Sequence, residues 1–238
     1  MLKRYCTAGL VALTLLLGTN CRADSNADLR RALTRFLPDL PASTRIVKTP
    51  YGGLYEIDLG TQVFYTDVHG SFLIDGEILD TRSGINVTKA RIEQLQKVDW
   101  KQLPLKDAFT IVYGNGQRQV ASFEDPYCPY CKKMDQTLAE VGNLTVHVFL
   151  LPVIRDDSPV LSRDIWCSAD PARAWQAWMS DKTAPAKAAA GCATPLDANL
   201  ALAQRLGIQS TPTLILDNGQ RLTGAVDAAE FKRRQAQH

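Results

Sequence analysis

The feature that most constrains the fold of this chain is a pair of cysteines, Cys128 and Cys131, at the boundary between a strand and a helix. The short apolar run from Val120 to Phe123 has strand character, and the stretch from Pro129 to Val141 has helical character. Proline suits the first helical position because its missing N–H would be unpaired there in any case. The pattern predicts a strand, a turn and a helix, with Cys128 just before the helix and Cys131 one turn inside it.

The two thiols of such a motif have different expected chemistry. Cys128 lies where free backbone N–H groups and the helix dipole favour an anion, which lowers its pKa and raises the thiolate fraction at neutral pH. Cys131 is expected to be more buried, and it can attack a mixed disulfide that forms at Cys128. We therefore predict Cys128 as the nucleophile and Cys131 as the resolving thiol of a redox site.

Two structural explanations compete with this redox interpretation. A disulfide confined to Cys128 and Cys131 closes so small a loop that it gains little stability and is strained. A zinc site needs four ligands, commonly from a second CxxC pair or a histidine pair, but the three histidines at 69, 147 and 238 form no spaced pair. We expect no metal and no cofactor.

The order of elements around the motif is typical of a thioredoxin-like domain, which has an α+β or α/β fold. A β-α-β unit comes first, a helical insert follows, and a β-β-α unit ends the chain. The downstream elements are expected at Leu144 to Leu150 (strand), Ser158 to Met179 and Pro195 to Leu206 (helices), Thr213 to Leu216 and Gln220 to Thr223 (strands joined by the turn Asn218-Gly219), and from Asp227 onward (helix).

A second motif, Thr211-Pro212, stands directly before the strand at Thr213 to Leu216. A proline there blocks one hydrogen bond of the sheet and suggests a turn or a cis peptide bond. Thioredoxin-like folds place a cis-proline loop beside the active cysteines. The two motifs together therefore support the redox interpretation more strongly than either does alone.

The first 23 residues have the pattern of a secretory signal peptide. Lys3 and Arg4 are followed by an apolar stretch that is too short to span a bilayer, and small residues precede a cleavage position after Ala23. Lipidation of Cys21 is the alternative, and Asn20 before it fits that signal poorly. Cleavage would remove three basic residues and change the net charge from +2 to −1, which is too near neutral for a dedicated nucleic-acid-binding protein.

The first half of the mature chain predicts a small β-rich domain over residues 24–86. A helix is expected from Asp24 to Leu40, followed by period-two alternation with a hairpin turn at Asp75-Gly76. So small a sheet has exposed edges and gains by pairing with a second copy, so we predict a dimerisation domain, with an edge strand blunted by charge as the alternative. A polar linker helix follows at 87–105, its body reaching Leu103 over about 24 Å, and the catalytic domain spans 106–238.

Two further cysteines, Cys167 and Cys192, remain in the mature chain, and an even number in an exported protein indicates disulfides. A bond between them closes a loop of about 25 residues and would contribute roughly 3–4 kcal/mol. We interpret this pair as structural, with a second redox pair as the alternative.

Three charged residues, Glu124, Asp125 and Lys132, flank the active motif. A charged face of this kind is usually solvated, so we expect each of them to have a minor tuning role. The residue six positions before Cys128 is Ser122, so no acid occupies the place where thioredoxin-like oxidoreductases often carry a proton-transfer carboxylate. We assign no general base.

The stretch from Phe123 to Cys131, with the sequence FEDPYCPYC, resembles the active site of the periplasmic disulfide isomerases DsbC and DsbG. The resemblance covers nearly the whole mature chain, although the Pro129-Tyr130 dipeptide is the DsbG version while the overall length is closer to DsbC. Its other parts are Ile165 to Ser168, Gly207 to Thr213, Asp217 to Gly219, the Asp75-Gly76 region and Asn86 to Thr88.

The resemblance implies a periplasmic homodimer that acts on misfolded, disulfide-containing exported proteins. It implies a reduced Cys128 maintained by a DsbD-like membrane reductase, and a substrate backbone held by Thr211 and Pro212. The DsbG side of the resemblance implies two alternatives, reduction of protein sulfenic acids and a holdase chaperone activity. A net oxidase is a further alternative. The near-neutral net charge predicts no nucleic-acid partner.

Overall fold

The computed structural model describes residues 25–236, so the expected signal peptide and the cleavage position after Ala23 lie outside the described residues. The described chain divides into two compact units. One holds the residues up to Leu59 together with Phe64–Asp75, and the other holds Gly60–Val63 and the chain from Gly76 onward. Within residues 25–236, no helix has both the length and the apolar character that crossing a bilayer requires.

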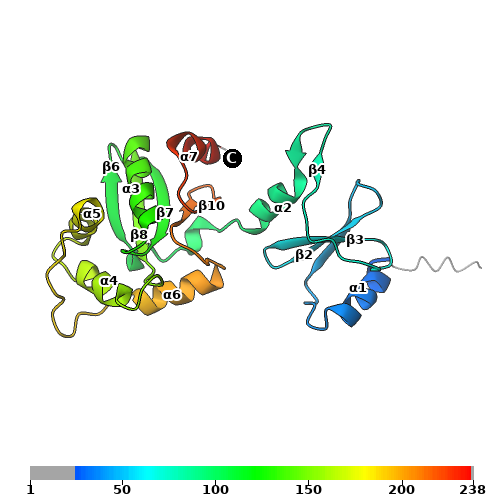
Figure 1. The fold of residues 1–238 in the computed structure, drawn as a ribbon, viewed down its shortest axis with the longest axis horizontal. Coiled ribbons are helices and arrows are strands. Elements are labelled where there is room, and N and C mark those ends of the chain that lie inside the picture. The colour runs from blue at the N-terminus through cyan, green and yellow to red at the C-terminus, as the bar shows by residue number, and fades with distance from the viewer. Residues whose placement is uncertain (1–24, 237–238) are drawn as a thin grey trace, which may run out of the picture. The chain divides into compact units, whose positions relative to one another are not determined.

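The N-terminal part of the chain consists of a helix and a small sheet (Figure 1). Helix α1 (Ser25–Phe36) precedes the strands β1 (Arg45–Lys48), β2 (Tyr55–Leu59) and β3 (Gln62–Thr66), which lie in the order β1-β2-β3. The helix ends four residues earlier than expected, at Phe36, whose side chain is exposed. The buried cluster between helix and sheet comprises Leu29, Leu33, Ile46, Tyr55 and Ile57.

The expected hairpin at Asp75-Gly76 is wrong. Ile74 instead forms an isolated bridge with Tyr65, and the hairpin lies further along, where β4 (Leu79–Asp80) pairs with β5 (Ile85–Asn86). The turn between these strands contains Gly84, whose φ of 70° is a conformation that glycine adopts without steric cost. The sequence signal was misplaced because the glycine with the required φ is Gly84 and not Gly76.

The helix expected to reach Leu103 is also shorter in the structure. Helix α2 (Val87–Leu95) starts at the cap Asn86, and short 3₁₀ turns η1 (Trp100–Gln102) and η2 (Leu105–Asp107) replace its second half. Burial of Val98 in the C-terminal core ends the helical pattern, because the Val98 N–H donates to the Gly219 carbonyl oxygen at 3.0 Å. Gly219 has a φ of 82°, and a Cβ there would lie 2.6 Å from the Val98 oxygen, so this contact needs glycine.

The C-terminal unit is built on a five-stranded sheet in the order β10-β9-β7-β8-β6 (Figure 1). The central pair β7 and β8 is parallel, and β6, β9 and β10 are antiparallel to their neighbours. The edge strand β6 was not expected from the sequence. The strands are β6 (Phe109–Tyr113), β7 (Arg118–Glu124), β8 (Leu144–Leu150), β9 (Thr213–Leu216) and β10 (Arg221–Thr223).

Two buried clusters hold helices against this sheet. The single helix expected from Ser158 to Met179 is two helices, because Pro171 lacks the N–H that a continuous helix needs and Asp170 caps the second one by accepting from the Arg173 N–H. The helices are α3 (Pro129–Val141), α4 (Ser158–Trp166), α5 (Pro171–Asp181), α6 (Leu196–Arg205) and α7 (Ala228–Gln235).

Candidate active site

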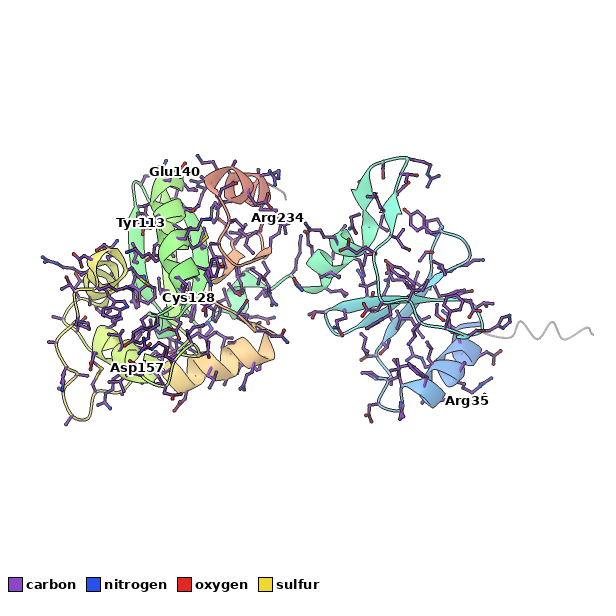
Figure 2. The ribbon with its side chains drawn as sticks, viewed as in Figure 1. Arg35, Tyr113, Cys128, Glu140, Asp157 and Arg234 are labelled. Carbon is purple, nitrogen blue, oxygen red and sulfur yellow. A yellow bond between two sulfur atoms is a disulfide. The ribbon has the colours of Figure 1, made fainter. Side chains whose placement is uncertain are left out.

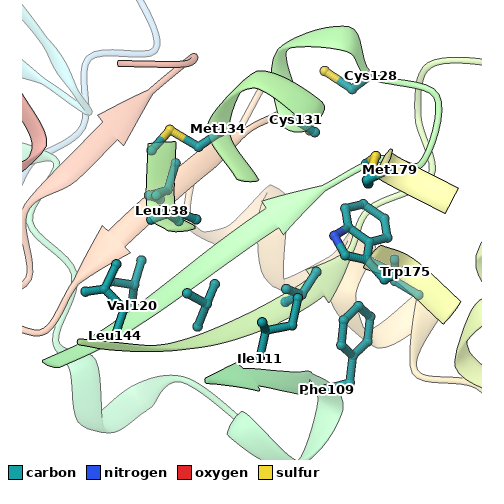
Figure 3. Packing of buried hydrophobic residues seen from close by; sticks show 14 of the residues in the cluster. Phe109, Ile111, Val120, Cys128, Cys131, Met134, Leu138, Leu144, Trp175 and Met179 are labelled. Atoms are coloured by element: carbon teal, nitrogen blue, oxygen red, sulfur yellow. The ribbon is translucent and has the colours of Figure 1, made fainter. Parts of the chain in front are cut away.

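The two central cysteines lie where β7 passes into α3. Cys128 is the N-cap residue of α3, with extended backbone angles, and Pro129 is the first helical residue. Figure 2 shows Cys128 at one end of α3 and Glu140 at the other. The side chain of Cys128 is 4% exposed and that of Cys131 is 0% exposed, and both pack into the core cluster drawn in Figure 3. A partner can therefore approach Cys128 but not Cys131.

The environment of Cys128 stabilises its thiolate and lowers its pKa to about 5. The largest contribution is a hydrogen bond from the Cys131 thiol, and a side-chain interaction with Thr211 and the backbone N–H groups of Cys131 and Tyr130 add to it, while burial opposes it. The N–H groups act as the expected helix N-terminus does. Sequence reasoning identified this helix contribution but missed the larger one from the second thiol.

Cys131 has the opposite electrostatics. Burial raises the pKa of its thiol strongly, and its hydrogen bond to Cys128 and the charge of Glu124 raise it further. At neutral pH Cys131 is a protonated donor, and it cannot attack a disulfide until it loses its proton. The site thus holds one ionised and one protonated sulfur in direct contact.

The Thr211-Pro212 loop lies against Cys128. The peptide bond between the two residues is cis, and the Cys128 thiol, in its protonated form, donates to the Thr211 carbonyl oxygen at 3.2 Å. The Thr211 hydroxyl oxygen is buried and has no hydrogen-bond partner within the described part of the chain. It can therefore donate to the Cys128 thiolate, which agrees with the lowering of the Cys128 pKa by this side chain.

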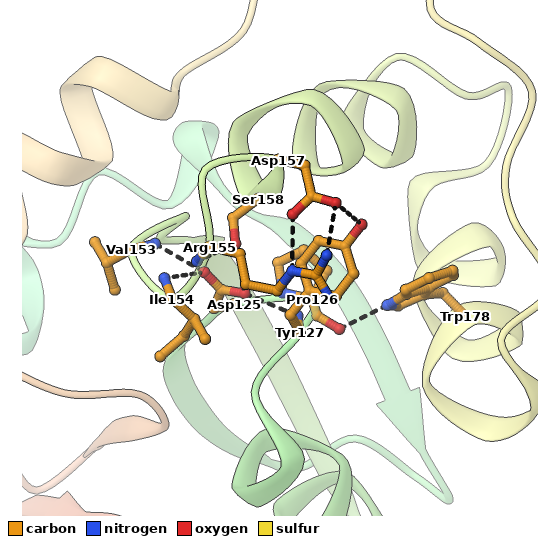
Figure 4. A network of polar contacts seen from close by, with 9 residues as sticks. All are labelled: Asp125, Pro126, Tyr127, Val153, Ile154, Arg155, Asp157, Ser158 and Trp178. Carbon is orange, nitrogen blue, oxygen red and sulfur yellow. Dashed lines mark hydrogen bonds and ion pairs between the residues drawn. The ribbon is translucent and has the colours of Figure 1, made fainter.

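Asp125 organises the turn that leads into the cysteine motif (Figure 4). Its buried carboxylate accepts from the backbone N–H groups of Val153 and Ile154 at 2.7 and 2.9 Å through Oδ2. Through Oδ1 it accepts from the Tyr127 N–H at 2.8 Å and the Ser158 hydroxyl at 3.1 Å. One carboxylate therefore fixes both the turn before Cys128 and the 153–158 loop beside it.

The side chain of Tyr127 provides a second connection between the turn before Cys128 and the 153–158 loop. Its hydroxyl donates to the Asp157 Oδ2 at 2.9 Å, and the Arg155 guanidinium lies 4.3 Å from the centre of its ring (Figure 4). The Trp178 indole packs edge-on against the ring and donates to the Pro126 carbonyl oxygen at 2.6 Å. These contacts connect α5 to the active-site turn.

The expectation that Glu124 and Asp125 lie on a solvated face is wrong, because both side chains are 0% exposed. Glu124 follows Ser122 on the same face of β7 and accepts from its hydroxyl at 2.5 Å. Burial raises the pKa of Glu124 well above its usual range, while its interactions with the Ser122 hydroxyl and the Cys131 side chain oppose that rise. The two-residue period of the strand places Glu124 on the face of Ser122, which is the signal that sequence reasoning could have used.

Lys132 and the Cys167–Cys192 pair lie outside the network of contacts described above for Cys128, Cys131, Glu124 and Asp125. Lys132 is partly exposed, and its ammonium group donates to the Ser180 carbonyl oxygen at 2.8 Å. Cys167, at the end of α4, forms a disulfide with Cys192 in the loop before α6. Among residues 25–236, no cluster of three or more His, Cys, Asp or Glu side chains is arranged to hold a metal ion.

A thioredoxin-like sheet that carries a CxxC pair at a helix N-terminus, beside a cis-proline loop, defines a thiol–disulfide oxidoreductase. Comparison with known proteins agrees with this class. The Thioredoxin-like domain family matches residues 105–237, and the family described as the disulfide bond isomerase protein N-terminal domain matches residues 21–89. The predicted fold class is thereby confirmed.

Similar proteins carry a more specific name. The probable thiol:disulfide interchange protein DsbC of Bordetella pertussis is 39% identical over 191 residues, which are 80% of this chain and 67% of the relative. The thiol:disulfide interchange protein DsbC of Escherichia coli is 28% identical over 198 residues, 80% of each chain. A crystal structure of a disulfide interchange protein from Neisseria gonorrhoeae aligns with a TM-score of 0.53 and 30% identity, covering 57% of this chain and all of that one. The chain belongs to the DsbC family of thiol:disulfide interchange proteins, as the resemblance predicted.

Proposed function

We propose that this protein is a disulfide isomerase and reductase that uses Cys128 as its nucleophile and Cys131 as its resolving thiol. The observation that carries the proposal is the opposite shift of the two pKa values, down to about 5 for Cys128 and strongly upward for Cys131. A low pKa supplies a thiolate at neutral pH, and a high pKa keeps the second thiol from competing for substrate.

The reaction follows from this difference. The Cys128 thiolate attacks one sulfur of a substrate disulfide, a bond forms between the two sulfurs, and the other substrate sulfur leaves with the electron pair. In isomerisation, that substrate thiolate or another one attacks the mixed disulfide, forms a new substrate disulfide and returns Cys128 as a thiolate. In reduction, Cys131 loses its proton and attacks Cys128, which leaves the substrate sulfur as a thiolate and Cys128 bonded to Cys131.

The surface beside Cys128 supports a polypeptide substrate with exposed apolar side chains. Tyr130, Val153 and Ile154 are exposed to 62%, 49% and 50%, although each is a large hydrophobic residue. The N–H groups of Val153 and Ile154 are bound to Asp125, so these two exposed side chains stand on an anchored backbone. The Thr211-Pro212 loop at Cys128 supports a role for both residues in holding the substrate backbone.

Membership of the DsbC family supports expectations about the oligomeric state, location and partners of this protein. We expect a homodimer formed through the N-terminal domain at 24–86, joined by the 87–105 segment to the catalytic domain at 106–238. We expect location in the periplasm after removal of a signal peptide, with misfolded, disulfide-containing exported proteins as substrates. A DsbD-like membrane thiol reductase would return the Cys128–Cys131 disulfide to the dithiol.

The test is refolding of a scrambled protein with several disulfides in a mildly reducing glutathione buffer. We expect the mature protein to accelerate recovery of the native pairing by at least about tenfold, because its thiolate attacks at neutral pH while glutathione is mostly protonated. Native activity of the scrambled protein is the measurement. Refolding no faster than in buffer alone contradicts the isomerase function, and reduction of a protein sulfenic acid in the same preparation would then favour the alternative activity.

A further inference from the structure

The resolving thiol is buried with a strongly raised pKa, so reduction requires a route by which its proton leaves. Glu124 is a candidate acceptor, since its carboxyl interacts with the Cys131 side chain, whose S–H can donate to it once the Cys128 thiolate no longer accepts that proton. Oε1 of Glu124 accepts from the Ser122 hydroxyl, while Oε2 is buried and has no hydrogen-bond partner within residues 25–236. An oxygen left in this state can accept a proton from Cys131.

A second carboxyl lies one helical turn beyond Cys131. Asp135 is four residues along α3, so the two side chains lie on neighbouring positions of one helix face. The Trp175 indole N–H donates to the Asp135 Oδ2 at 2.9 Å, and Figure 3 shows Trp175 packed next to Met179 and Phe109. Burial raises the pKa of Asp135 to about 7, and the charge of Asp135 in turn raises the pKa of Glu124. The two acids interact strongly enough to disfavour ionisation of both at once.

Asp135 also faces a pocket. A cavity of about 230 Å³ between α3, α5 and β6 has Asp135 in its wall and is open at the surface. This volume is large enough for several water molecules. Besides Asp135, its wall includes Tyr113 and Lys132. Asp135 therefore contacts both the buried side of α3 and a solvent-accessible space.

We propose that Glu124 and Asp135 form a proton exit for Cys131, in which Glu124 takes the thiol proton and Asp135 passes it to water in the α3–α5–β6 pocket. This proposal rests on the resolving role of Cys131 proposed above. Glu124 acts on the reacting thiol, and Asp135 acts through Glu124.

The step balances without any further reactant. In the mixed disulfide, the S–H bond of Cys131 breaks and its proton moves to the Glu124 carboxylate. The sulfur electron pair forms the bond to Cys128, and the substrate sulfur leaves with the pair of the broken bond. One proton then leaves through Asp135, which restores the Glu124 carboxylate, and the reverse sequence supplies a proton when the Cys128–Cys131 disulfide is reduced.

The reaction itself prepares the acid pair for this step. The negative charge of the Cys128 thiolate is one of the causes that raise the pKa of Glu124. Formation of the mixed disulfide removes that charge, so Glu124 ionises more easily when a base is needed. The other titratable groups around the pair are Tyr113, whose pKa is raised to about 12 and which stays neutral, and Lys132 at the pocket wall.

The test separates the two chemical steps with an aromatic disulfide reagent that releases a coloured thiolate. Attack by Cys128 releases the first thiolate, and attack by Cys131 on the mixed disulfide releases the second one. In the full mature chain we expect Asp135→Asn to slow the second release about tenfold near pH 7, and Glu124→Gln to slow it at least as much, because general-base assistance is lost. The first release, which needs only the Cys128 thiolate, should stay within about twofold.

The pH profile distinguishes a proton path from a structural role. In the unchanged protein the second release should level off above about pH 7, where the acid pair has lost its first proton and carries one negative charge, since the pKa of Asp135 is about 7. In Asp135→Asn it should continue to rise with pH, since hydroxide must then remove the proton. Asparagine can still accept from the Trp175 N–H, and Asp135→Glu should restore the plateau.

Glu140→Gln is the matched control, because Glu140 is an exposed acid at the far end of α3. A profile for Asp135→Asn equal to that of the control overturns the exit path, as does an effect confined to Glu124→Gln. Loss of the first release in Asp135→Asn would also overturn it, because the effect would not be confined to the Cys131 step. Absence of the first release from the unchanged protein would instead contradict the proposed function of Cys128.

Discussion

Replacement of Cys128 by alanine is expected to abolish thiol–disulfide interchange, with a loss of at least about a thousandfold in the rate of substrate disulfide reduction. The Cys128 pKa of about 5 lies two units below neutral pH, so nearly every molecule carries the reactive thiolate. Cys131 cannot take its place, because its sulfur is fully buried and its pKa is strongly raised. Reduction of a peptide disulfide, followed by the appearance of free thiols, measures the loss.

The companion variant Cys131→Ala is the control that distinguishes loss of the nucleophile from loss of the resolving thiol. It retains the nucleophile but lacks the resolving thiol, so mixed disulfides with substrate should accumulate and be visible on a non-reducing gel. Cys128→Ala should form none. Covalent complexes of Cys128→Ala through Cys131 would contradict the assignment of the two sulfurs.

Asp125→Ala is expected to lower the free energy of unfolding by about 3 kcal/mol or more, since each donor left unsatisfied costs about 1–3 kcal/mol. Four donors from two segments meet this one buried carboxylate, among them the N–H groups of Val153 and Ile154. Chemical denaturation of the mature chain, followed by tryptophan fluorescence, measures the change. The same substitution should also loosen the turn before Cys128.

Asp156→Ala is the matched control for this experiment. Asp156 lies in the same loop and is exposed, so its loss should change the stability by no more than about 0.5 kcal/mol. Equal stability of the two variants would show that the Asp125 hydrogen bonds do not hold the active-site turn.

The central elements of the catalytic unit were predictable because local sequence signals and tertiary packing agree there. Pro129 at the first helical position and the apolar face of α3 define that helix, and the uniform apolar run of β8 defines a buried strand. The hairpin at Asp75-Gly76 and the long linker helix were wrong because tertiary contacts override the local signal. Ile74 pairs with Tyr65, and Val98 is bound to Gly219, a residue more than a hundred positions away in sequence.

The residues of the candidate site also fall into two groups, those that the sequence predicted and those whose burial it did not. The thiol pair and the Thr211-Pro212 loop follow from motifs that are contiguous in the sequence. The acids do not, because a carboxylate beside a CxxC motif gives no sign of whether it faces water. Asp125 is buried by donors from residues 153–158, and the buried Glu124 interacts with Cys131 and Asp135 on α3, so both depend on segments that the chain brings together only on folding.

The most direct test of the account is the rate of alkylation of Cys128 by iodoacetamide as a function of pH. The buried Cys131 thiol does not compete, so the rate reports the thiolate fraction of Cys128. We expect the rate to rise with an inflection near pH 5 and to remain flat from about pH 6.5 to 8, as the pKa of about 5 requires. An inflection near pH 8.5, the value of an ordinary cysteine, would contradict the claim that this site stabilises the Cys128 thiolate.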